Sequence, residues 1–461
     1  MALDIVNAAT ELTPTFSGQL LEPGDATYEE ARTVHNGLID KRPALIARCR
    51  GVADVADAVG IGQKLRLETA VRGGGHNVAG RATVDGGVMI DLAPMKGIHV
   101  DPVRRTARAQ GGVTWGEFNR ETQLYGLAVT GGVVSSTGIA GLTLGGGLGW
   151  LMGKHALALD NLLSIDLVLG NGRVVTASEH ENADLFWAAR GGGGNFGVAT
   201  SLEYRLHPVG PQITGGLIAY PFDLAWDVLR HYRDMTNRLP DELALFGGFV
   251  HAPDGSGQKL AAMVLCHCGS LAEGEKAVQP IKAFGKPAMD AIAAMPYTQM
   301  NTMLDAAYPR GALNYWKSSF LATLSDDAIR AMIDCFARCP TPMGQLLLEH
   351  FHGAVTRIGP TDTAFPHRSP GYNMLLLAQW MDRQQNSACI AWARDSYASL
   401  QPFMGTGRYV NYFDDDEPRD AIAAAYGPNY RRLQQIKAKY DPENFFRMNQ
   451  NIQPLGSKPE G

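Results

Sequence analysis

The 461-residue sequence has few cysteines, no long apolar run and no cluster of basic residues. Without an apolar run of about 18 residues, a membrane-spanning helix is not expected. The formal net charge is −5, and the basic surface typical of nucleic-acid-binding proteins is missing. No CxxC pair occurs, so a disulfide framework is not predicted for the six cysteines, Cys49, Cys266, Cys268, Cys335, Cys339 and Cys389.

The first residues do not have the pattern of a signal peptide, because Asp4 occurs early and neither a basic segment nor a continuous apolar core follows. We therefore expect a cytoplasmic protein that binds a small-molecule substrate, and neither nucleic acid nor a membrane. A metal site at Cys266-His267-Cys268 is not expected, because adjacent residues on a strand point to opposite faces. The sequence does not indicate an oligomeric state.

Glycine is abundant instead, with 53 residues and clusters at residues 73–75, 145–147 and 191–194. The first cluster is the most informative, because it follows a strand-like run and leads into His76 and Asn77. Glycines let the backbone bring several N–H groups to one anion. The guanidinium of Arg72, next to the loop, is suited to a diphosphate. This loop predicts a nucleotide site.

Two segments resemble common nucleotide-binding motifs, but the residues around them do not fit either motif. Residues 192–197 match GxGxxG, but the segment after them alternates with period two and begins with β-branched residues. It predicts a strand where the dinucleotide fingerprint requires a helix. Residues 149–154 lack the four-residue gap of a P-loop, and His155 occupies the position of the Mg²⁺-binding hydroxyl. A β-rich nucleotide site of another type is therefore expected.

The periodicity predicts an α+β protein whose character changes near residues 208–211. Before this turn, short strand-like runs alternate with glycine-rich turns, and the clearest helix covers residues 52–64. A helix is also expected from Thr27 through His35. Beyond the turn, strand-like runs alternate with long helices, which predicts an antiparallel sheet covered by helices on one face. These helices are expected at residues 224–239, 271–284, 326–339 and 384–400.

Five segments in sequence order resemble the FAD-linked oxidases of the vanillyl-alcohol oxidase superfamily, specifically the berberine-bridge-enzyme-like branch. They are residues 71–77, 138–147, 184–192, 409–411 and 449–454. The resemblance implies a two-domain fold in which the FAD-binding domain is split. Its parts would be an N-terminal lead (residues 1–39), a PCMH-type FAD-binding domain (40–208), an antiparallel-sheet substrate domain (209–404) and a C-terminal segment that returns to the FAD domain (405–461).

The resemblance also implies that the first glycine loop wraps the FAD pyrophosphate and that His76 is bonded covalently to the C8-methyl carbon of the flavin. Many relatives add a second bond from a cysteine, but Val134 occupies that position. A single attachment is therefore expected. The implied cofactor-binding residues are Arg72, Gly73, Gly74, Gly75, His76, Asn77, Gly80, Val134, Thr137, Gly138, Gly141, Leu144, Gly145, Gly147, Gly194, Phe196, Gly197, Val198, Tyr409, Asn411 and Asn449.

The resemblance implies Tyr409 as a catalytic tyrosine, with Tyr412 as the second candidate; the alternative for Tyr409 is a packed strand residue. A phenol with a pKa near 10 needs a neighbouring cation or hydrogen-bond network to act as a base. Some relatives have a lysine and a Glu or Gln on a nearby strand, where this sequence has Asn373 and Leu375. The usual assistant of the base is therefore expected to be absent.

The expected activity is that of an FAD-dependent oxidase that moves a hydride from an alcohol or amine C–H to the flavin and then to O₂, giving hydrogen peroxide. Thr137 has the β-branched shape of the valine that accompanies oxidase activity in the family, or it is simply a turn residue. The alternatives are a flavin dehydrogenase with another acceptor and a flavin-binding protein without turnover. Sugars, phenolic alcohols, cyclic amines and polyketide-like molecules all stay open as substrates.

Overall fold

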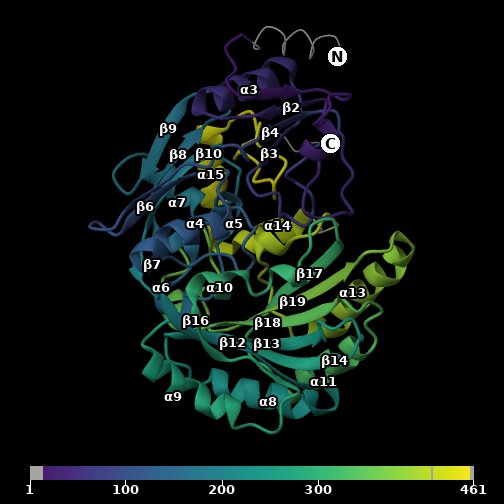
Figure 1. Ribbon diagram of the computed structural model, residues 1–461. Helices are drawn as coiled ribbons and strands as arrows, with labels where there is room; N and C mark the ends of the chain where they lie inside the picture. Colours follow the sequence, from purple (N-terminus) through teal and green to yellow (C-terminus); the bar gives the residue numbers. More distant parts are fainter. Residues whose placement is uncertain (1–13, 417–418, 457–461) are drawn as a thin grey trace.

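The computed structural model describes residues 14–416 and 419–456 of the chain (Figure 1). The segment around Asp4, where the sequence has no signal-peptide pattern, lies outside the described residues. Among the helices of the described part, none combines the length and the apolar character needed to cross a membrane. The expected cytoplasmic location stays a prediction.

The chain begins with a four-stranded sheet in the order β1-β2-β4-β3. Strands β2 and β3 are both parallel to β4, and helix α3 connects them. Val55 and Val59 of α3 are buried, in agreement with the helical spacing. The domain boundaries stay predictions, although β1 pairs with β2 and so belongs to this sheet. The elements are β1 (Gln19–Leu21), β2 (Leu45–Arg48), α3 (Val52–Leu65), β3 (Thr69–Arg72) and β4 (Val88–Asp91).

The helix expected from Thr27 through His35 is shorter than predicted. Helix α2 covers only Tyr28–Ala31. The carbonyl oxygens of Ala31 and Thr33 accept hydrogen bonds from the Arg72 guanidinium, at 2.6 and 2.9 Å, and are not used to continue the helix. The apolar spacing of residues 27–35 gives no sign that a residue about 40 positions away binds these carbonyl oxygens, so the helix was predicted to be too long.

A five-stranded antiparallel sheet follows, in the order β5-β6-β10-β8-β9. Strand β10 begins directly after the GxGxxG segment, so the dinucleotide fingerprint is excluded. Helices α5 and α7 were not predicted, because each has only seven residues and so shows too few turns for helical periodicity to be recognised. The elements are β5 (Ile98–Asp101), β6 (Thr106–Gln110), α4 (Trp115–Thr122), β7 (Leu127–Ala128), α5 (Ile139–Gly145), α6 (Met152–His155), β8 (Leu162–Val168), β9 (Val174–Ser178), α7 (Ala183–Ala189), β10 (Val198–Arg205) and β11 (His207–Pro208).

The second half forms one large antiparallel sheet in the order β15-β12-β14-β13-β18-β19-β17, with β16 beside β12. Long helices cover its far face, and the first half lies over the other (Figure 1). Strand β12 was not predicted, because two glycines interrupt its alternation. The strands are β12 (Gln212–Pro221), β13 (Leu243–His251), β14 (Lys259–His267), β15 (Met289–Asp290), β16 (Ala293–Pro296), β17 (Leu313–Leu321), β18 (Gln345–Phe351) and β19 (Gly371–Trp380).

The helices of this half match the expected ones closely; they are α8 (Ala225–Thr236), α9 (Leu271–Lys282), α11 (Asp326–Ala337) and α13 (Asn386–Leu400), with the short α10 (Tyr297–Thr302) and α12 (Ala354–Arg357) between strands. The core lies between sheet and helices. Leu346 and Leu348 of β18 are fully buried in it. Because side chains alternate along a strand, Leu347 and Glu349 point to the opposite face, toward the first half of the chain.

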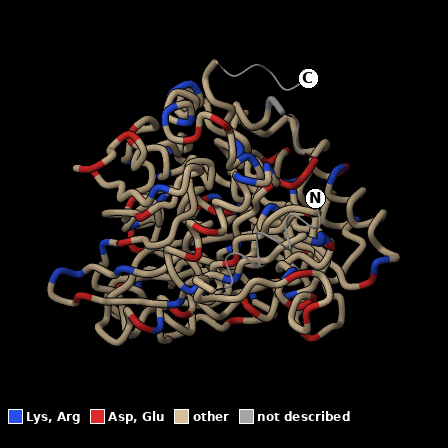
Figure 2. The backbone as a smooth tube through the Cα atoms, turned by 90° about the horizontal axis from the view of Figure 1, so that it is seen from above, with Lys and Arg blue, Asp and Glu red and all other residues tan. Residues whose placement is uncertain are grey.

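Basic and acidic residues are interspersed along the chain (Figure 2). Arg108, for example, pairs with both Asp166 and Glu203 across the five-stranded sheet, at 2.9 Å each. An exposed ion pair contributes only about 0–1 kcal/mol to stability. The fold therefore depends mainly on its buried apolar residues.

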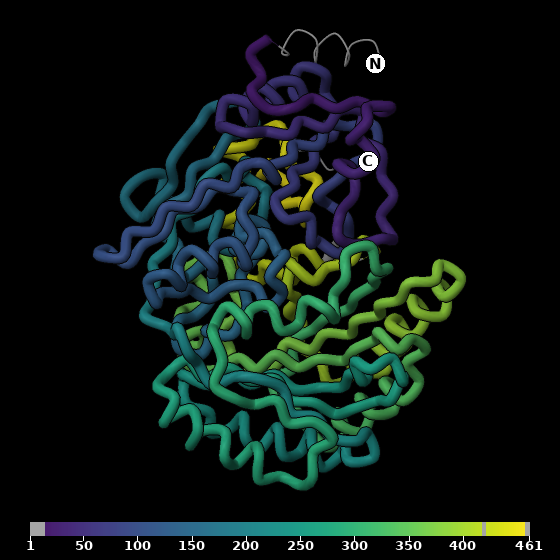
Figure 3. The backbone as a smooth tube through the Cα atoms, viewed as in Figure 1, coloured from purple at the N-terminus to yellow at the C-terminus, as the bar shows by residue number. Residues whose placement is uncertain are grey.

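The C-terminal segment lies among elements of the first half (Figure 3). Its elements are the 3₁₀ turn η7 (Val410–Tyr412), α14 (Arg419–Tyr426) and α15 (Tyr430–Tyr440). The buried ammonium of Lys437 in α15 donates to the carbonyl oxygen of Asn195 at 2.6 Å and pairs with Asp441 at 2.6 Å. The turn η7, which carries Tyr412 toward the large sheet, is held by the amide of Asn411, which donates to the carbonyl of Leu142 at 3.0 Å, and by the amide of Gln450, which donates to the carbonyl of Val410 at 2.9 Å.

Candidate functional site

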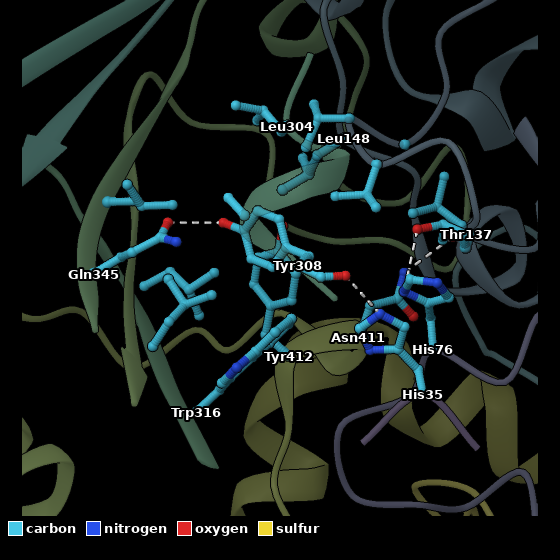
Figure 4. Close-up of a pocket in the computed structure, with 18 of the residues that line it drawn as sticks. His35, His76, Thr137, Leu148, Leu304, Tyr308, Trp316, Gln345, Asn411 and Tyr412 are labelled. Atoms are coloured by element: carbon cyan, nitrogen blue, oxygen red, sulfur yellow. Dashed lines mark hydrogen bonds between the residues drawn. The ribbon is translucent and has the colours of Figure 1, made fainter. Parts of the chain in front are cut away.

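A cavity of about 810 Å³ lies between the glycine-rich loops of the first half and the large sheet. Figure 4 shows His76 and Thr137 on one side of the cavity, Tyr412 and Trp316 on the other, and Asn411 between them. A volume of this size is within the range of pockets that bind cofactors and small ligands. The cavity therefore brings both halves of the chain to one site.

The first glycine loop and the start of α5 approach each other more closely than side chains would allow. A Cβ atom on Gly74 would lie 2.2 Å from the backbone nitrogen of Gly138, and one on Gly138 would lie 2.3 Å from that of Gly74. Among the described residues, the N–H groups of residues 74–77 have no protein acceptor. Successive free N–H groups form an anion-binding concavity.

The guanidinium of Arg72 is bonded to protein groups and does not line the cavity. Its Nε and Nη2 donate to the carboxylate of Asp91 at 2.9 and 2.6 Å, and its Nη1 donates to two backbone carbonyls. Arg48 also contacts Asp91, at 3.2 Å. The side chain of Arg72 therefore anchors the loop to β4, and only backbone groups of the loop face an anion.

Replacing Asp91 with asparagine is expected to destabilise the protein by about 3–5 kcal/mol, because the buried Arg72 would lose its counter-charge. Thermal denaturation would measure the effect. The matched control is Asp327→Asn in the exposed pair with Arg330, where a change below about 1 kcal/mol is expected. Equal melting temperatures for the two variants would contradict this account.

His76 is held at the end of the loop by three neighbours. Its Nε2 lies 2.8 Å from the Ser136 hydroxyl, and its Nδ1 lies 3.4 Å from that of Thr137. Its ring stacks on His35, with 4.0 Å between the centroids. Burial, together with His35 and Arg310, lowers the pKa of His76 to about 3. The imidazole is therefore neutral at physiological pH and has an unprotonated ring nitrogen.

Val134, at the position where the resemblance implies a cysteine in many relatives, lines the cavity. All six cysteines are buried as free thiols elsewhere in the chain. Within the described residues no group of acidic, histidine or cysteine side chains could hold a metal ion.

Tyr409 is buried, and its hydroxyl oxygen accepts two hydrogen bonds. The donors are the N–H of Gly147 at 2.9 Å and the side-chain amide of Asn411 at 2.8 Å. Burial raises the pKa of Tyr409 to about 12. This phenol therefore stays protonated at neutral pH and fixes Asn411 at the cavity wall.

Tyr412 contacts a residue that sequence analysis missed. Its hydroxyl donates to Oε1 of Glu349 on β18 at 2.9 Å, and the amide of Asn373 on β19 donates to Oε2 at 2.6 Å. Burial raises the pKa of Glu349 to about 7, although both hydrogen bonds oppose the rise. A carboxyl group with a pKa near the working pH is suited to proton transfer.

Most of the expected cofactor residues line the cavity: Gly73, Gly74, Gly75, His76, Asn77, Val134, Thr137, Gly138, Gly141, Leu144, Gly194, Gly197, Tyr409, Asn411 and Asn449. Six others do not line it, and their expected contact with the cofactor stays a prediction: Arg72, Gly80, Gly145, Gly147, Phe196 and Val198. Phe196 and Val198 belong to the core. Gly147 acts through its hydrogen bond to Tyr409. Gly80 and Gly145 lie directly against Ile39 and Asn411.

Comparison with known proteins agrees with this geometry. The FAD binding domain model matches residues 43–178, and the berberine and berberine like model matches residues 408–453. (R)-6-hydroxynicotine oxidase of Paenarthrobacter nicotinovorans is 33% identical over 460 residues, which cover 96% of this chain and 98% of that protein. The chain belongs to the berberine-bridge-enzyme-like FAD-linked oxidases. It is thus an enzyme, and its cofactor is FAD.

Two other relatives support the assignment of this FAD-linked oxidase to the family. An FAD-linked oxidoreductase of Dictyostelium discoideum is 30% identical over 98% of both chains. The crystal structure of 6-hydroxy-D-nicotine oxidase from Arthrobacter nicotinovorans superposes with a TM-score of 0.87 at 30% identity and covers 97% of this chain and 99% of its own. The expected two-domain α+β fold is therefore confirmed.

Proposed function

We propose that this oxidase oxidises a C–H group next to a hydroxyl or amine, with FAD attached covalently to His76 and with Glu349 as the proton acceptor. The observation that carries the proposal is that the Tyr412–Glu349 pair faces the same cavity as the glycine loop and His76. The residues fit FAD in two respects. The free N–H groups of residues 74–77 suit its diphosphate, and a Cβ on Gly141 would meet nothing within 4 Å, which leaves space along the cavity wall.

When bound, FAD supplies the two-electron chemistry: it accepts the hydride, and O₂ reoxidises it to give hydrogen peroxide. The protein has to take the one proton that is released, from the substrate O–H or N–H. Tyr412 is within hydrogen-bond reach of Glu349, so Glu349 can accept this proton directly or through the Tyr412 hydroxyl. Asn373 holds the carboxylate in place at 2.6 Å. Tyr409 and Asn411 position the neighbouring wall.

The proposal is tested by anaerobic mixing of the enzyme with benzylic and cyclic amines, phenolic alcohols and glucose oligomers. At least one of them is expected to bleach the flavin absorbance, and air should restore it with one hydrogen peroxide per cycle. Restoration by a dye but barely by air would indicate a dehydrogenase. A flavin that no compound of the panel bleaches would favour a binding protein.

Replacing Thr137 with leucine is expected to slow reoxidation by O₂ by about tenfold or more, equivalent to about 1.4 kcal/mol in the barrier. Thr137 lines the cavity beside His76, and leucine would extend into the path of oxygen. Stopped-flow mixing of the reduced enzyme with oxygenated buffer measures the rate. Thr137→Val keeps the shape and is the matched control. If Thr137→Leu reoxidised as fast as Thr137→Val, the role of this residue would be refuted.

A further inference from the structure

The face of the large sheet that lines the cavity has an apolar row across five adjacent strands. The row consists of Leu375, Leu347, Gly248, Ala262 and Ala219, and each residue is the direct cross-strand partner of the next. All five line the cavity. Neighbouring strands are about 4.8 Å apart, so the row is about 19 Å long. Its small residues, Gly248, Ala262 and Ala219, leave more space above the sheet at the end away from Leu375.

Three polar side chains near the row already have a protein partner. The Tyr308 hydroxyl donates to Gln345 at 2.9 Å, the Trp316 indole donates to Asn314 at 3.2 Å, and the His251 imidazole donates to the carbonyl of Gly344 at 3.0 Å. The side chains of the row offer no hydrogen-bond partner, so a sugar lying on the row would lose hydrogen bonds of its hydroxyls to water, which costs free energy at each group. The row therefore favours an apolar ligand.

The row lies next to the proposed proton acceptor. Glu349 follows Leu347 by two residues on β18, so both point into the cavity about 7 Å apart. The cross-strand neighbours of Glu349 are Asn373 and Phe246. A ligand whose reacting group meets Tyr412 and Glu349 can thus extend over the row.

We propose that the substrate has an extended apolar body, an alkyl chain or a fused ring system, that lies along the apolar row, with the amine or hydroxyl at Glu349 as its main polar group. This inference rests on the proposed function for the placement of the reacting group. It predicts that oligosaccharides bind this site poorly. The apolar body of the substrate is expected to add to the binding free energy only over the length of the row.

The test is isothermal titration of the FAD-loaded enzyme with alkyltrimethylammonium ions from butyl to decyl, and with cellobiose. These ions have no nitrogen lone pair and are not oxidised, so the result does not depend on turnover. Affinity is expected to rise by about twofold to fourfold for each added methylene, the upper value corresponding to full burial. Cellobiose is expected not to bind. A dissociation constant that does not change with chain length, or tight binding of cellobiose, would overturn the inference.

Variants separate binding on the row from unspecific adsorption. Leu347 is only partly buried, so Leu347→Asn is expected to fold and to reduce the gain per methylene. Ala262→Leu should weaken the longest ions and leave butyl binding unchanged. Leu124→Asn, at an exposed position outside the cavity, is the matched control and should behave as the wild type. A chain-length dependence that Leu347→Asn leaves unchanged would also refute the proposal. If no compound is ever turned over but the affinity still rises with the chain length of the ions, only the proposed function is refuted and the apolar row is still supported.

Discussion

Replacing His76 with alanine is expected to abolish the acid-stable yellow colour of the protein. The wild type should keep its flavin in the pellet after acid precipitation, whereas the variant should release all of it into the supernatant. The physical reason is that alanine has no nitrogen to bond the flavin. In the wild type, the stack on His35 and the contact with Ser136 hold the ring in one orientation, and the low pKa of His76 leaves a nitrogen lone pair free.

The matched control for this experiment is His99→Ala, which removes an exposed histidine far from the cavity lining and should keep the flavin in the pellet. Absorbance of the pellet and the supernatant near the flavin maximum gives the covalent fraction. Yellow colour in the wild-type supernatant would disprove the attachment. Flavin in the pellet of His76→Ala would show that another residue forms the bond.

The glycine loop shows what the sequence could and could not predict. Free backbone N–H groups follow from three successive glycines, because glycine accepts backbone conformations and close approaches that other residues do not. The position of the Arg72 side chain does not follow, because Asp91, the residue that binds it, is 19 positions away on β4. Local motifs thus predicted the backbone of the site better than the direction of its charged side chain.

The proton acceptor was missed for a related reason. Strand-like runs were expected between the long helices of the second half, and β18 (Gln345–Phe351) is one of them. The available signal was Glu349, the one acidic residue in a strand that is mostly apolar. The positions where an assistant of the base is expected are occupied by Asn373 and Leu375, and Asn373 is the cross-strand partner of Glu349. The pairing register of β18 and β19 brings the carboxylate to the site, and register depends on contacts across the whole sheet.

Replacing Glu349 with glutamine is expected to lower kcat/KM by about 10²- to 10⁴-fold, the usual contribution of a positioned general base. Glutamine keeps the size of the side chain and can still bond Tyr412 and Asn373, so flavin content should not change. Anaerobic bleaching rates with a substrate from the screen measure the effect. Glu275→Gln on the exposed side of α9 is the matched control. A loss smaller than threefold would exclude Glu349 as the base.

The pH dependence distinguishes a base from a residue that only supports the structure. Glu349 must be ionised to accept a proton, and burial raises its pKa to about 7. The wild-type kcat/KM should therefore fall as pH decreases through about 7, and the Glu349→Gln profile should lack this decrease. Tyr412→Phe should retain it, because the carboxylate is still present, at a lower rate. If Tyr409→Phe removed the decrease and Glu349→Gln did not, the base would be Tyr409, and the strongly raised pKa of its phenol would have to be reversed by the bound flavin.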